Sequence, residues 1–202
     1  MKAPAQFETA RLTLRQPQIS DAAAIFERYA SDPDVTRFLG WPRHQTVRDT
    51  EAFLQFSAQE WRRWPAGPYL ITLRDGGRLL GSMGLAFQAP HDAMTGYVLA
   101  KDAWGKGYAT EALAGMIDVA VRIGVTRLSA LCHPDHRPSR RVLEKCGFVR
   151  DTSTAQVEFP NLSPAVKQEA MCYVLAIEAG ENHLGLTRQA AERRAWTRTS
   201  PA

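Results

Sequence analysis

Hydrophobic and polar residues alternate strictly over residues 11–15, a pattern typical of a strand with one buried face. Leu12 and Leu14 are the expected inward positions of this strand. A helix is predicted next, because Ser20 can cap it and its apolar residues repeat at the spacing of one helix face, namely Ala22, Ile25, Phe26 and Tyr29. The Asp-Pro pair at residues 32–33 is expected to end this helix.

A second helix and a hairpin are predicted in the next stretch. Thr46 and Asp49 have the spacing of a capping box, which sets the start of the helix, and Pro65 stops it. The apolar positions of this helix are Val47, Leu54, Ala58 and Trp61. Residues 69–74 and 79–87 are apolar runs on either side of the turn Asp75-Gly76-Gly77-Arg78, which is typical of a β-hairpin.

The second half of the chain alternates between strand and helix patterns. Strands are predicted near residues 94–100, 127–132, 148–158 and 169–177, and helices over residues 108–123 and 139–145. Gly124 and Gly147 are natural C-terminal stops for these two helices. We therefore expect one domain over residues 1–178 with the element order βααβββαβαββ. Residues 179–202 carry few apolar side chains and are expected to form a tail that is loosely attached or disordered.

Composition supports a single globular domain. The 202-residue chain is 45% hydrophobic and 23% charged, which is ordinary for a protein with an apolar core. Its 25 Lys and Arg against 21 Asp and Glu give a formal net charge of +4, too modest to indicate a nucleic-acid partner. No apolar stretch has the length of a membrane span, and residues 1–10 lack the apolar core of a signal peptide, so neither is expected. Three cysteines without CxxC spacing indicate no disulfide framework, so we expect a cytoplasmic protein.

The candidate chemistry lies where the strand near residues 94–100 passes into the helix over residues 108–123. Gly105 and Gly107 bracket Lys106 at this junction. The free backbone N–H groups and partial positive charge of a helix N-terminus suit a phosphate, and glycines let the main chain approach it. The turn matches neither a P-loop nor a dinucleotide-binding fingerprint, so taken alone it is more typical of a structural turn.

A second motif about thirty residues downstream changes this interpretation. Together the two motifs make the sequence similar to the GNAT superfamily of N-acetyltransferases, and to its branch of RimJ- and RimL-like ribosomal-protein acetyltransferases. The matching segments, in family order over about residues 7–177, are Thr9-Ala10-Arg11-Leu12, Gly96-Tyr97-Val98-Leu99, Trp104-Gly105-Lys106-Gly107-Tyr108-Ala109-Thr110-Glu111-Ala112 and Ser139-Arg140-Arg141-Val142-Leu143-Glu144-Lys145-Cys146-Gly147-Phe148.

The resemblance implies an α/β (α+β) fold in which a mixed, mostly antiparallel sheet of about seven strands is flanked by four helices. Two splayed strands, here near residues 94–100 and 127–132, would hold the pantetheine arm of acetyl coenzyme A. The cofactor-binding residues implied are Val98, Leu99, Trp104, Gly105, Lys106, Gly107, Tyr108, Ala109, Thr110, His136 and Ser139.

The sequence departs from the family pattern at two of these positions. Trp104 stands where the family often has Gln or Arg, and His136 stands where it usually has Asn. An imidazole can also hydrogen-bond a pantetheine amide, so His136 is kept among the expected cofactor contacts.

The catalytic residues implied by the resemblance are Glu158 and Ser139. Many relatives place a tyrosine acid where this chain has Leu143, whereas the RimL-like alternative uses a serine at the start of this helix and a glutamate on the following strand. We therefore expect Glu158 to act as general base and Ser139 as proton donor near the sulfur. Ser139 is equally suited to cap the helix, and Glu158 to be a solvated charge at the end of a strand.

The expected enzyme is a GNAT-type acyltransferase that moves an acetyl group from acetyl coenzyme A to a primary amine by direct attack in a ternary complex. Phe38 and Trp41 are expected to line the acceptor pocket, as this segment does in the family, although packing in the core is an alternative for Trp41. The acceptor is a protein N-terminal α-amine or a small molecule such as an antibiotic or polyamine. One alternative is a non-catalytic acyl coenzyme A-binding protein of the same fold, and another is a module whose arginine-bearing tail docks on a nucleic acid or a ribosome.

Further partners are limited by the sequence. Cys132, His133 and His136 lack a second ligand pair with zinc spacing, so no metal is expected. Neither a membrane nor a nucleic acid is favoured as a partner, and the expected oligomeric state is a monomer or homodimer.

Overall fold

The centre of the molecule is one mixed sheet of eight strands in the order β1-β2-β3-β4-β5-β6-β8-β7. The computed structural model describes residues 1–177, so the expected tail over residues 179–202 lies outside the described residues. The strands are β1 (Gln6–Glu8), β2 (Leu12–Arg15), β3 (Pro68–Leu73), β4 (Leu79–Ala89), β5 (Asp92–Leu99), β6 (Arg127–Cys132), β7 (Val149–Glu158) and β8 (Lys167–Ala176). All neighbouring strands are antiparallel except β5 and β6.

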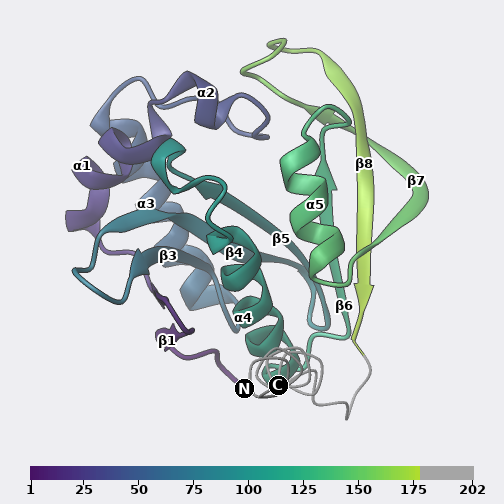
Figure 1. Ribbon diagram of the computed structural model, residues 1–202, viewed down its shortest axis with the longest axis horizontal. Helices are drawn as coiled ribbons and strands as arrows, with labels where there is room; N and C mark the ends of the chain where they lie inside the picture. Colours follow the sequence, from purple (N-terminus) through teal and green to yellow (C-terminus); the bar gives the residue numbers. More distant parts are fainter. Residues whose placement is uncertain (178–202) are drawn as a thin grey trace, which may run out of the picture.

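Helices cover both faces of this sheet. They are α1 (Ala22–Ile25), α2 (Pro33–Thr36), α3 (Val47–Arg63), α4 (Tyr108–Arg122) and α5 (Arg137–Lys145), with short turns η1 (Ile19–Asp21), η2 (Phe26–Ala30) and η3 (Lys101–Ala103). In Figure 1, α4 and α5 lie in front of the sheet and α3 lies behind it. Among residues 1–177, no helix is long and apolar enough to cross a bilayer.

The core has one apolar layer for each face of the sheet. The larger layer packs α4 and α5 against the strands and includes Leu113, Met116 and Leu143. Leu12 and Leu14 are fully buried there, as predicted from their alternation. The smaller layer packs α1 and α3 against the other face, chiefly through Ile25, Leu54 and Leu70.

Most predicted elements are confirmed close to their expected bounds. β3 and β4 form the predicted hairpin, and Gly76 and Gly77 in its turn have positive φ angles of 73° and 63°. The capping box of Thr46 and Asp49 is present at the start of α3. α4 ends beside Gly124, which has a φ of 85°.

The structure differs from the predicted elements in three places, each for an identifiable reason. The sheet has an additional strand, β1, whose three residues are held by pairing with β2. The first helical segment ends at Ala30, just before the Asp32-Pro33 pair as predicted, but an additional short helix, α2, begins at Pro33, because the Asp32 side chain accepts backbone N–H groups and proline fits a position where no N–H is needed. α5 begins at Arg137 rather than Ser139, with His136 as its N-cap, because Pro138 is tolerated in the first turn.

The feature that positions the site is an opening between two parallel strands. β5 and β6 pair at only three positions, the last of which joins Met94 to Ser129. Beyond this point both strands continue, β5 to Leu99 and β6 to Cys132, without being paired to each other. The sheet therefore contains a gap with a strand edge on each side.

Candidate functional site

The β5 side of the gap presents backbone groups that could bind an extended ligand. The Ala100 N–H donates to Leu80 O on β4 at 2.7 Å. Backbone groups in an antiparallel pair alternate in direction, so those of Val98 also face β4, whereas those of Tyr97 and Leu99 face the gap. The Leu99 carbonyl accepts the indole N–H of Trp104 at 2.8 Å, which agrees with this direction. An extended chain bearing amides could add here as a further strand.

Beyond the end of β5, the chain turns into the N-terminus of α4. Gly105 and Gly107 have φ angles of 73° and 79°, in the left-handed region that glycine adopts without strain. Gly107 is the N-cap of α4, so the next three N–H groups, those of Tyr108, Ala109 and Thr110, have no carbonyl within the helix. The turn therefore has the backbone geometry of an anion site.

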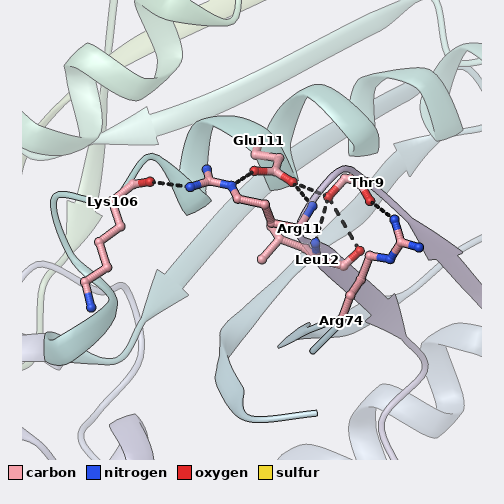
Figure 2. A network of polar contacts seen from close by, with 6 residues as sticks. All are labelled: Thr9, Arg11, Leu12, Arg74, Lys106 and Glu111. Atoms are coloured by element: carbon pink, nitrogen blue, oxygen red, sulfur yellow. Dashed lines mark hydrogen bonds and ion pairs between the residues drawn. The ribbon is translucent and has the colours of Figure 1, made fainter. Parts of the chain in front are cut away.

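A polar network ties this turn to the start of the chain, as Figure 2 shows. The Glu111 carboxylate accepts the Thr9 hydroxyl at 2.6 Å, the Arg11 backbone N–H at 2.7 Å and the Arg11 Nε–H at 2.6 Å. Arg11 Nη1 donates in turn to Lys106 O at 3.1 Å. Burial raises the pKa of Glu111, but the hydrogen bonds from Thr9 and Arg11 outweigh it and hold the pKa below its usual value.

Glu111→Gln should lower the free energy of unfolding near neutral pH by about 1.5–3 kcal/mol, the usual value of hydrogen bonds to a charged group. The carboxylate contributes fully above the pKa of an unfolded glutamate, and its contribution is lost as pH falls through the lower pKa of the native state. The difference from the parent should therefore shrink in acid. Denaturant unfolding at neutral and acid pH measures it. Glu144→Gln is the matched control, because glutamine keeps an oxygen that can accept the Tyr173 hydroxyl, which donates to Glu144 Oε1 at 3.3 Å. An undiminished difference in acid would contradict the assignment.

A cavity of about 500 Å³ runs through the gap to both faces of the sheet. Its strand walls are β4, β5 and β6, and α5 contributes His136, Ser139 and Leu143. The wall on the α3 side is apolar and largely aromatic, with Phe38, Leu39, Trp41, Phe53 and Phe56, and with Val157 and Phe159 at the end of β7. Glu60 is the one carboxylate among the described lining residues.

Tyr97 and Ser139 form a hydroxyl pair in this cavity. The Tyr97 hydroxyl lies 3.0 Å from Ser139 Oγ and 3.0 Å from the Ser139 carbonyl oxygen. Burial is the main cause that raises the pKa of Tyr97 well above its usual value, so its hydroxyl stays protonated. Ser139, the predicted proton donor, therefore has a partner in Tyr97, whose hydroxyl can donate a hydrogen bond to Ser139 Oγ.

Two histidines stack on one face of the cavity wall. The Phe38 ring lies 4.8 Å from the His136 ring at an interplanar angle of 25°, and 5.0 Å from the His133 ring. Burial, and then the neighbouring His133, lower the pKa of His136. Among residues 1–177, no group of three or more His, Cys, Asp or Glu side chains is placed to hold a metal ion.

The predicted site residues fall into three groups in space. Phe38, Trp41, Val98, His136 and Ser139 line the cavity, whereas Leu99 and residues 104–110 lie beside it at the end of β5 and the start of α4. Glu158 is exposed at the end of β7 and is not among the lining residues, although its neighbours Val157 and Phe159 are. Its role as general base stays a prediction that this geometry does not support.

Sequence reasoning missed Tyr97 as a site residue. Val98, which was predicted to bind the cofactor, contributes a side chain to the cavity, but its backbone faces β4. Tyr97 presents its backbone to the gap and its hydroxyl to Ser139. The alternation of residues along β5 could have indicated this, once the pairing of Ala100 with Leu80 was known.

Comparison with known proteins places the chain in a family. The model of the acetyltransferase (GNAT) domain matches residues 11–149. The uncharacterized N-acetyltransferase YoaA of Bacillus subtilis is 29% identical over 160 residues, which cover 78% of this chain and 90% of YoaA.

Solved structures agree on the fold. RimL, a ribosomal L7/L12 alpha-N-protein acetyltransferase in complex with coenzyme A, has a TM-score of 0.75 at 21% identity, over 89% of this chain and 99% of that one. The microcin C7 self-immunity acetyltransferase MccE, in complex with acetyl-CoA and AMP, also has a TM-score of 0.75, at 20% identity over 86% of this chain and 97% of that one. Because the family model spans most of the described residues and the relatives agree with it, the chain belongs to the GNAT family of N-acetyltransferases.

Proposed function

We propose that the protein transfers the acetyl group of acetyl coenzyme A to a primary amine by direct attack in a ternary complex. The observation that carries this proposal is the gap between β5 and β6, which has unpaired backbone groups along it, a helix N-terminus at one end and an aromatic cavity passing through it. These are the parts needed to hold a long ligand that has amides in the middle and a pyrophosphate at one end.

The residues on the cofactor side fit acetyl coenzyme A. The backbone of Tyr97 and Leu99 would bond the pantetheine amides, and the first-turn amides of α4 would bond the pyrophosphate. Lys106 has an exposed side chain beside this turn and would add a positive charge. When bound, the thioester supplies an activated acetyl group, and the chain's own residues orient it and move the protons.

The acceptor side favours an amine attached to an apolar or aromatic group. α3 buries one stripe, formed by Thr50, Leu54, Ser57 and Trp61, against the core. Phe53 and Phe56 lie outside that stripe and line the cavity, and Phe56 is 52% exposed. A polyamine or aminoglycoside carries several positive charges and would require several carboxylates, whereas only Glu60 is present in the described lining.

An N-terminal α-amine remains within this acceptor class. RimL is by name an alpha-N-protein acetyltransferase of ribosomal L7/L12. A peptide whose first residue has an apolar side chain presents the same chemistry as a small arylalkylamine. A non-catalytic acyl coenzyme A-binding protein is the alternative, and it would bind the cofactor without releasing a thiol.

An acceptor screen tests the proposal directly. Peptides with apolar or polar N-terminal residues, 2-phenylethylamine, spermidine and an aminoglycoside would be supplied with acetyl coenzyme A while free thiol is measured. We expect thiol release that depends on the amine and is fastest with the apolar acceptors. Cofactor binding without amine-dependent thiol release would favour the non-catalytic alternative.

Trp41→Ala should raise the KM for the acceptor amine more than it changes the affinity for acetyl coenzyme A. The side chain lines the aromatic part of the cavity, and the backbone of its loop is held independently, since Asn161 Nδ2 donates to the Trp41 carbonyl at 2.8 Å. Steady-state kinetics and calorimetry separate the two effects. Trp64→Ala, which removes a tryptophan stacked on Phe87 outside the cavity lining, is the control. Equal loss of both affinities would favour the core-packing interpretation of Trp41.

A further inference from the structure

The cavity contains few groups that can accept a proton from an amine. Its titratable lining residues, within the described chain, are Glu60, Tyr97, Cys132, His133 and His136. Direct attack requires an unprotonated amine, yet an alkyl amine is mostly protonated near neutral pH. One of these groups, or solvent, must take that proton.

Four of the five groups are unsuited to this role. Burial raises the pKa of both Tyr97 and Cys132, so each keeps its own proton at neutral pH. Both ring nitrogens of His133 are engaged: Nδ1 accepts the Asp135 backbone N–H at 3.1 Å, which leaves the proton on Nε2, 3.3 Å from Gln168 Oε1. Glu60 lies on α3, on the opposite side of the sheet from α5, whose Ser139 pairs with Tyr97 of β5 (Figure 1).

His136 differs from all of these. Within residues 1–177, its ring nitrogens have no hydrogen-bond partner, while its ring is fixed against Phe38 at 4.8 Å. It is the N-cap of α5, three residues before Ser139, and both side chains line the cavity. A fixed, half-buried imidazole with both nitrogens available is suited to accept a proton.

The charged surroundings of this imidazole are sparse. His133 lies on the same Phe38 ring, and the Arg37 guanidinium is 5.2 Å from that ring. The Asp135 carboxylate is 82% exposed and 4.0 Å from His133 Nδ1. Burial first, and His133 second, lower the pKa of His136, so its basic form prevails at neutral pH.

We propose that His136 is the general base of this acetyltransferase and takes the proton of the acceptor's ammonium group in the cavity. The proposal rests on the proposed function, and it assigns the proton acceptor to α5 rather than to Glu158, whose side chain is exposed at the end of β7.

The proton and electron balance of the reaction is complete. A ring nitrogen of His136 takes one proton from the ammonium, and the freed nitrogen lone pair forms the C–N bond to the carbonyl carbon. The C–S bond breaks with its electron pair going to sulfur, and the second nitrogen proton ends on that sulfur through the nearby Ser139 hydroxyl. His136 returns its proton to water, so ammonium and thioester give amide, thiol and one proton.

The test uses two acceptors that differ in basicity but little in shape. Fluorine substituents beside the amine withdraw electrons, so 2,2-difluoro-2-phenylethylamine is a much weaker base than 2-phenylethylamine and is largely unprotonated at about pH 8. His136→Gln should lower kcat about a hundredfold with 2-phenylethylamine, within the usual range for a lost general base. With the fluorinated amine, kcat should stay close to the parental value. His91→Gln, in the β4–β5 turn, is the matched histidine control and should leave both rates unchanged.

Two binding measurements accompany the kinetics. NMR titration of the histidine rings in the full-length protein, with His136 assigned from the variant, should show that His136 titrates below the ordinary value of about 6.5. Calorimetry distinguishes the base from the pantetheine contact that the resemblance implies: for a base, His136→Gln should bind acetyl coenzyme A as the parent does.

Several results would overturn the proposal. An equal loss of kcat with both amines, or a loss confined to acetyl coenzyme A affinity, would make His136 a structural or pantetheine-binding residue. A titration at or above the ordinary histidine value would exclude it as a base, and so would a hundredfold loss of kcat in Glu158→Gln with no effect in His136→Gln. If the parent acetylates no amine at all, the proposed function fails instead, and the titration still decides whether His136 is a neutral imidazole.

Discussion

Gly107→Val should weaken the binding of acetyl coenzyme A at least tenfold, or about 1.4 kcal/mol. Gly107 caps α4 at a φ of 79°, where its backbone can approach an anion bound to the first-turn amides. A Cβ at this position would meet only Arg11 Nη2, at 3.5 Å, so the folded chain has space for it. The expected loss therefore comes from the branched side chain beside the anion site and from backbone strain at the N-cap. Calorimetry with acetyl coenzyme A measures it.

Gly76→Val separates backbone strain from the anion site. Gly76 has a φ of 73°, close to that of Gly107, and an added Cβ would have nothing within 4 Å. It lies in the β3–β4 turn, outside the cavity lining and the 104–110 turn. This variant should lose stability to a similar degree but bind acetyl coenzyme A like the parent. If folded Gly107→Val also binds like the parent, the pyrophosphate does not lie on this turn.

Strong local signals account for the parts of the fold that were predicted from the sequence. Each of these signals reflects a local requirement of the backbone. They are the alternation around Leu12 and Leu14, the glycine turn at residues 75–78 and the helix stops Gly124 and Gly147. The family motifs placed the turn before α4. None of these signals needs information about distant residues, which is why they were sufficient.

The additional elements β1 and α2 have different causes. β1 is three residues long and exists because β2 pairs with it, so its own sequence carries little strand signal. The Asp32-Pro33 pair marks the end of the first helix correctly, but Asp32 also makes the N-cap of α2, so the same dipeptide follows one helix and begins another.

The site shows the same limit in finer detail. Alternation along β7 requires that Glu158 point away from Val157 and Phe159, yet the sequence of β7 does not say which face borders the cavity. Along β5, alternation separates Tyr97 from Val98, but only the pairing with β4 shows which of them faces the gap. The sequence thus predicts which segments come together. The pairing of the strands in three dimensions decides which of their side chains face the gap and the cavity.

The pairing of β5 with β4 sets the orientation of Tyr97, whose hydroxyl lies beside that of Ser139. This contact leads to a double-mutant prediction. Tyr97 has one proton and two acceptors at 3.0 Å, the carbonyl oxygen and the Oγ of Ser139. When this proton goes to Oγ, the Ser139 proton is free to point at the departing sulfur, and the two hydroxyls act as one unit. Ser139→Ala should then lower kcat about a hundredfold, and Tyr97→Phe about tenfold, with little change in acetyl coenzyme A affinity.

Because the Tyr97 hydroxyl acts through Ser139, the double variant should be no slower than Ser139→Ala alone, so the two free energies should not add. Tyr173→Phe is the matched control, since that hydroxyl donates to Glu144 on the same helix at 3.3 Å and lies outside the cavity lining. It should leave kcat unchanged. The rates of the four proteins at saturating acetyl coenzyme A measure the coupling. If Tyr97→Phe costs the same factor with and without Ser139, the two hydroxyls act independently, and Tyr97 contributes to the cavity through its ring alone.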